Sequence, residues 1–75
     1  MSISQTEILY NNIMKLKELR EENGHTQTDV AKFLNVKQNT YSQYETEKRQ
    51  LPIDVLIKLS KFYGVSTDYI LGLDD

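Results

Sequence analysis

The 75-residue chain contains no cysteine, one histidine, one proline and three glycines. Without cysteine it can form no disulfide framework, thiolate nucleophile or cysteine-ligated zinc site, and His25 alone leaves no multi-histidine metal site. Its apolar stretches, such as residues 55–57, are far shorter than the roughly 20 residues of a transmembrane helix. The first residues lack the basic and apolar regions of a secretory signal. We therefore expect a cytoplasmic protein that uses no metal, cofactor or membrane.

Groups suited to catalysis are equally scarce. The chain has no glycine-rich phosphate loop and no paired carboxylates in an expected cleft. Ser42 and Asp29 have no base partner other than His25. The sequence therefore predicts that the chain is not an enzyme.

Charge gives only a weak signal for a nucleic-acid partner, because the net charge is −2. The distribution of charge is more informative than the sum. Residues 1–23 carry three basic and four acidic side chains, residues 24–50 carry four and three, and residues 51–75 carry two and four. The middle third is the only one with a net positive charge, and composition alone does not indicate DNA binding.

Glycine and proline divide the chain into segments whose apolar residues recur every three or four positions, which is the spacing of amphipathic helices. We predict an all-α fold, a compact bundle of five short helices, over residues 6–23, 26–35, 38–46, 52–63 and 66–72. The length allows one domain, which we place at residues 1–75, with a core at 8–72 and an N-terminal extension at 1–7.

Helix ends and inward faces can be predicted from single residues. Thr26 and Asp29 have the spacing of a capping box, and Asn35 tolerates the left-handed conformation that ends a helix. We expect His25 to pack against Val30 as a hydrophobic staple. The inner face of the fourth helix is predicted to comprise Ile53, Leu56, Leu59, and Phe62 or Tyr63.

The third predicted helix has two contrasting faces. At 100° per residue, Tyr41 and Tyr44 lie on one side. The opposite side carries only amides and hydroxyls, from Gln38, Asn39, Ser42, Gln43 and Thr46. We expect the tyrosines to pack inward and the uncharged polar face to project outward.

The run QTDVAKFLNVKQNTYSQYET, residues 27–46, resembles the helix-turn-helix of the XRE family, which includes the Cro and cI-like phage repressors. The flanking runs LKELREENGHTQ and EKRQLPIDVLIKLSKFYGVSTDYILG resemble the remaining helices of that family, so the resemblance covers about residues 11–72. It implies a lambda-repressor-like domain whose third helix enters the major groove of double-stranded DNA.

The same resemblance implies roles for individual residues. It implies base readout by residues whose side chains can form hydrogen bonds with base edges, namely Gln38, Asn39, Ser42 and Gln43. Contacts to the DNA backbone fall to Gln27, Lys37, Thr46, Lys48 and Arg49. Gln27 also corresponds to a residue that often braces the first readout glutamine, and Arg20 and Glu45 match a structural ion pair. Among the departures from the family, Glu47 and Asn35 stand where relatives usually have glycine.

A domain of this kind implies a transcriptional regulator, and a repressor in particular. One recognition helix reads few base pairs, so we expect a homodimer on a two-fold symmetric operator. Relatives suggest a dimer contact in the segment from Tyr63 to Leu73, including Tyr69, and a bacterial or phage origin with a nucleoid-associated location. A protein-interaction module and an antitoxin with the same fold remain alternatives. So do a free-standing regulator and an excised N-terminal domain.

Overall fold

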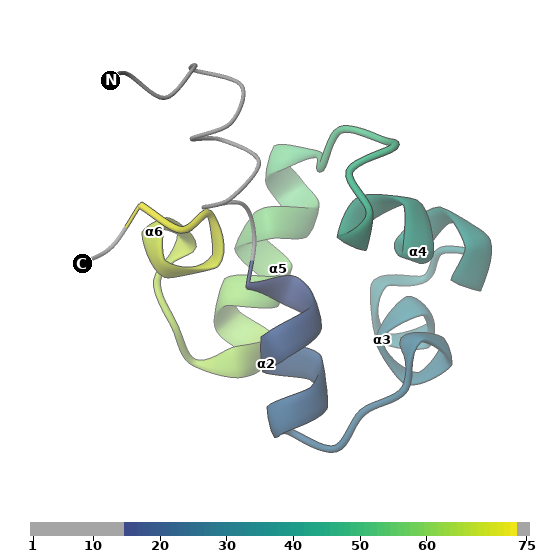
Figure 1. Ribbon diagram of the computed structural model, residues 1–75, viewed down its shortest axis with the longest axis horizontal. Helices are drawn as coiled ribbons and strands as arrows, with labels where there is room; N and C mark the ends of the chain where they lie inside the picture. The colour runs from purple at the N-terminus through teal and green to yellow at the C-terminus, as the bar shows by residue number, and fades with distance from the viewer. Residues whose placement is uncertain (1–14, 74–75) are drawn as a thin grey trace, which may run out of the picture.

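The computed structural model describes residues 15–73 of the chain (Figure 1). This part contains helices and no strands, which confirms the all-α prediction. The helices are α2 (Leu16–Glu22), α3 (Gln27–Leu34), α4 (Gln38–Glu45), α5 (Ile53–Tyr63) and α6 (Thr67–Ile70). The predicted extension at 1–7 and the predicted helical residues 6–14 lie outside the described part.

The helices surround one hydrophobic core. In Figure 1, α3 and α4 lie together at one end of the molecule and α6 at the other, with α2 and α5 between them. Each helix contributes buried side chains, and the core comprises Leu16, Leu19, Val30, Ala31, Leu34, Tyr41, Tyr44, Val55, Leu59 and Ile70. A bond from the Lys15 N–H to the Ile70 carbonyl, 2.8 Å long, ties the start of α2 to the end of α6.

The predicted signals at the start and end of α3 are confirmed. Thr26 and Asp29 form a reciprocal capping box, with bonds of 2.8 and 3.1 Å between backbone N–H groups and side-chain oxygens. Asn35 ends the helix in the left-handed region at φ 60°. The Val36 N–H then donates to the Ala31 carbonyl at 3.0 Å, which is a Schellman closure. This tight turn sets α4 directly after α3.

One packing prediction was wrong. Ile53 is 74% exposed rather than inward-facing, and Val55 and Leu59 are the buried residues of α5. The ring centroids of His25 and Phe62 lie 5.3 Å apart, so His25 has an aromatic neighbour on α5, and its contact with Val30 stays a prediction. Because apolar residues occupy two stripes of α5, its periodicity alone did not identify the buried one.

Candidate nucleic-acid interface

Helix α4 presents its polar face to solvent and its aromatic face to the core. Tyr41 and Tyr44 are buried, whereas Gln38 and Asn39 at the start of the helix are exposed. Ser42 and Gln43 continue the same face one turn later and are half-buried. The face therefore offers hydrogen-bond donors and acceptors without a formal charge, on a helix that the core holds in place.

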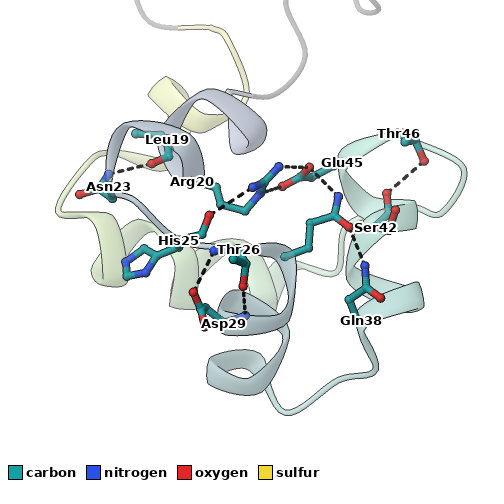
Figure 2. A network of polar contacts seen from close by, with 11 residues as sticks. Leu19, Arg20, Asn23, His25, Thr26, Asp29, Gln38, Ser42, Glu45 and Thr46 are labelled. Carbon is teal, nitrogen blue, oxygen red and sulfur yellow. Dashed lines mark hydrogen bonds and ion pairs between the residues drawn. The ribbon is translucent and has the colours of Figure 1, made fainter.

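A chain of side-chain hydrogen bonds joins the predicted readout face, which is the outward polar face of α4 with Gln38, Asn39, Ser42 and Gln43, to the body of the protein. Gln38 Nε2 donates to Gln27 Oε1 at 2.8 Å, and Gln27 Nε2 donates to Glu45 Oε1 at 3.1 Å. Arg20 on α2 then donates to both carboxylate oxygens of Glu45, at 2.7 and 3.2 Å. Figure 2 shows Arg20 and Glu45 pointing toward one another from α2 and α4. Gln38, the first of the predicted readout residues, is thus connected to a residue on α2.

The predicted pair of Arg20 and Glu45 lies in a sheltered position. The side chains are only 11% and 4% exposed, and Arg20 Nη1 also donates to the His25 carbonyl at 3.2 Å. The hydrogen bond to Glu45 raises the pKa of Arg20. Burial disfavours the charged form of Glu45, but interactions with Arg20, Tyr41 and Gln27 outweigh it and lower the pKa of the carboxyl. Both groups are therefore charged at neutral pH.

The basic residues expected to meet the DNA backbone lie at both ends of α4. Lys37 precedes the helix without a side-chain capping bond, while Lys48 and Arg49 follow it, and all three are exposed. Arg49 also donates from Nε to Gln43 Oε1 at 2.9 Å. The Thr46 hydroxyl donates to the Ser42 carbonyl of its own helix at 3.1 Å. The structure thus brings the expected backbone contacts to the margins of the readout face.

Two of these contacts were not foreseen from the sequence. The bond from Gln27 to Glu45 joins residues 18 apart, and the bond from Arg49 to Gln43 joins residues six apart. Neither separation is the three- or four-residue spacing of neighbours on one helix.

Among residues 15–73 no cluster of histidine or carboxylate side chains is arranged to hold a metal ion. Within the same residues no helix has the length and apolar character needed to cross a membrane.

Glu47 occupies a backbone conformation that disfavours its side chain. Its φ is 62°, in the left-handed region. The Glu47 N–H donates to the Tyr44 carbonyl at 3.3 Å, and the Lys48 N–H donates to the Gln43 carbonyl at 2.9 Å. These bonds form a Schellman closure, whose left-handed residue is most often glycine. Partial burial also raises the pKa of the Glu47 carboxyl, which means that its surroundings oppose the charge it carries at neutral pH.

The variant Glu47→Gly is expected to be more stable than the wild type by about 1 kcal/mol, because a left-handed residue other than glycine costs roughly 1–2 kcal/mol and glycine's own entropy offsets part of the gain. A thermal melt should show a midpoint about 4–8 °C higher. Glu47→Ala is the matched control, since it removes the charge and keeps the strain. Equal melting temperatures for the two variants would contradict the role of the backbone.

A model of the helix-turn-helix family matches residues 16–70 of the chain. The same region is similar to transcriptional regulators of Bacillus subtilis (strain 168). The chain is 48% identical over 61 residues to the HTH-type transcriptional regulator ImmR, covering 81% of the chain and 48% of the relative. It is 38% identical over 61 residues to the uncharacterized HTH-type transcriptional regulator YobD, covering 81% of the chain and 54% of the relative.

A phage protein gives a further match. The chain is 39% identical over 51 residues to the cryptic phage CTXphi transcriptional repressor RstR of Vibrio cholerae, covering 68% of the chain and 46% of that repressor. The chain thus spans about half the length of the curated relatives it matches. No solved structure matches the chain significantly.

Proposed function

This chain belongs to the helix-turn-helix family, of the XRE type, and on that premise we propose that it is the DNA-binding part of a transcriptional repressor. It recognises a specific double-stranded site by placing α4 in the major groove. Two copies bind a two-fold symmetric operator, since one recognition helix covers too few base pairs for useful specificity. The relative RstR is named as a repressor, which supports repression rather than activation.

The observation that carries the proposal is the arrangement of α4. Its buried tyrosines fix the helix to the core, and the N-terminal end of its outward face exposes Gln38 and Asn39. In helix-turn-helix proteins the N-terminal residues of the second helix meet the base edges. Glutamine and asparagine can bond adenine through its N6 and N7 atoms. The uncharged polar face is thus suited to reading bases rather than only to attracting phosphates.

The residues around this face supply the contacts that position the protein on DNA. Lys37, Lys48 and Arg49 are exposed cations at the ends of α4, where they can reach phosphates on both sides of the groove. Gln27 and Thr46 complete the set of backbone contacts. Because the three cations neutralise phosphates, binding should weaken steeply as salt is added.

The dimer contact belongs to the segment from Tyr63 to Leu73. Within it Leu73 is 63% exposed, and Tyr69 is only partly buried. This segment includes α6, which lies at the end of the molecule opposite α3 and α4 (Figure 1). A contact there leaves both readout faces free to enter successive turns of the groove.

The proposal is tested by selecting random duplex DNA with the purified protein and titrating the selected duplex against scrambled DNA. We expect enrichment of a two-fold symmetric site. Gln38→Ala and Asn39→Ala should each weaken binding to it by about 5- to 150-fold, which corresponds to roughly 1–3 kcal/mol per base contact.

Lys61→Ala provides the control for that titration. Lys61 is an exposed cation on α5, outside the surface described above, so its loss should leave the affinity nearly unchanged. Absence of any enriched site, with only weak salt-sensitive binding, would refute the proposal and favour a protein-interaction module.

A further inference from the structure

The loop after α4 returns Arg49 to the readout face. Glu47 reverses the chain at φ 62°, and the N–H groups of Lys48 and Arg49 both donate to the Gln43 carbonyl, at 2.9 and 3.2 Å. The Arg49 side chain then donates from Nε to Gln43 Oε1 at 2.9 Å. Arg49 is therefore held to Gln43 through both its backbone and its side chain.

The chemistry of the guanidinium group determines which end of the Gln43 amide it meets. A guanidinium group only donates hydrogen bonds, whereas an amide both donates and accepts. Arg49 must therefore engage the oxygen of Gln43, and the amide nitrogen of Gln43 keeps both of its protons. No residue within 15–73 accepts a hydrogen bond from that nitrogen. Gln43 is left as a donor on the outward face of α4.

Gln38 has the opposite arrangement, because its chain of contacts ends in a group that only accepts. The ionised carboxylate of Glu45 requires the nitrogen of Gln27, so Gln27 offers its oxygen to Gln38 Nε2. Gln38 keeps its amide oxygen and one N–H, which together match the N6 donor and N7 acceptor of adenine. Charged residues thus orient the two readout glutamines in opposite senses.

We propose that Arg49 is a specificity-determining residue: by holding the amide oxygen of Gln43, it makes Gln43 a donor toward the DNA. Gln43 then favours a base whose major-groove edge accepts hydrogen bonds, above all guanine through O6 and N7 or thymine through O4, whereas adenine offers only N7 beside its N6 donor. Cytosine is disfavoured, because its N4 group only donates. This inference rests on the proposed function, since it concerns the same readout face.

The test compares the base preferences of four proteins in the duplex selection: the wild type, Gln43→Ala, Arg49→Ala and Lys48→Ala. Gln43→Ala identifies the position that Gln43 reads. At that position Arg49→Ala should lower the preference for guanine or thymine over cytosine by about fivefold or more. Lys48→Ala removes the same charge one residue earlier, so it should weaken binding to all duplexes alike and lower the salt slope by about 1.

Reversing the charge at residue 49 provides a second measurement. In Arg49→Glu the new carboxylate accepts from the amide nitrogen and turns the oxygen of Gln43 outward, so the preference should move toward cytosine or adenine even though binding weakens overall. Because Arg49 is exposed, thermal melts should show that both Arg49 variants remain folded.

The outcomes separate this inference from the proposed function. If the wild type selects a site and Arg49→Ala loses affinity uniformly, as Lys48→Ala does, Arg49 is a phosphate contact only and the inference fails alone. If the wild type enriches no duplex, the proposed function fails and the inference fails with it. A changed base preference confined to the Gln43 position supports both.

Discussion

Replacing Arg20 with alanine is expected to lower the free energy of unfolding by about 1–3 kcal/mol, the usual effect of leaving a sheltered hydrogen-bonding group without its partner. The Glu45 side chain is 4% exposed, so water replaces the lost interaction only in part. The His25 carbonyl loses a donor as well. Urea denaturation of the variant should show the loss directly. DNA affinity should fall with it, because Glu45 anchors Gln27 and through it Gln38.

Two further measurements test whether the loss of stability in Arg20→Ala comes from the lost ion pair with Glu45. The pKa of Glu45 is lowered in the fold, so the pair stabilises the fold fully above the ordinary glutamate pKa of about 4.3. This contribution disappears as the pH falls through the folded-state pKa. The difference between the wild type and Arg20→Ala should therefore narrow in acid. The double variant Arg20→Met, Glu45→Leu should recover stability without recovering affinity. An Arg20→Ala protein of unchanged stability and weakened DNA binding would contradict this account.

The variant Tyr41→Ala is expected to lose about 3–5 kcal/mol, the usual cost of truncating a large buried aromatic residue. Tyr41 is fully buried and the largest of the fully buried side chains. A domain of this length is stable by only about 4–11 kcal/mol, so the variant should be substantially unfolded at physiological temperature. Circular dichroism melts and amide spectra would report the loss of the folded state.

Tyr41→Phe is the control, because it keeps the ring and removes only the hydroxyl. That hydroxyl is buried and, among residues 15–73, makes no hydrogen bond of normal geometry, although it lies near the Glu45 carboxylate. Burial, together with that carboxylate, raises the pKa of the phenol well above its usual range. Removing the hydroxyl should change stability by less than about 1 kcal/mol. A loss as large as that of Tyr41→Ala would show that the ring is not the main contributor.

Features that depend on neighbouring residues could be predicted from the sequence. The capping box at Thr26, the left-handed turn at Asn35 and the inward tyrosines of α4 follow from local spacing and side-chain chemistry. Ile53 shows where this reasoning stops. The fourth predicted helix carries two apolar stripes, and only packing against the other helices places Val55, and not Ile53, in the core beside Leu59.

The hydrogen bonds that orient the amides of the predicted readout face were harder to predict, because they also depend on how the helices are placed. Gln27 meets Glu45 only after the turn at Asn35 has set α4 against α3. Arg49 meets Gln43 only because Glu47 adopts a left-handed conformation, which glutamate disfavours. Turn geometry, and not residue spacing, creates both contacts. The polar residues of the face could be recognised in the sequence, whereas the orientation of their amides could not.

These contacts also bear on how such a domain acquires a new target sequence. Exchanging Gln38 alone leaves Gln27 with an amide oxygen that has lost its donor, and exchanging Gln43 alone releases Arg49. The four predicted readout residues therefore cannot be substituted independently of their neighbours. Residues 27 and 38 form one unit of change and residues 43 and 49 another, so successful retargeting, in evolution or in the laboratory, should proceed by paired substitutions.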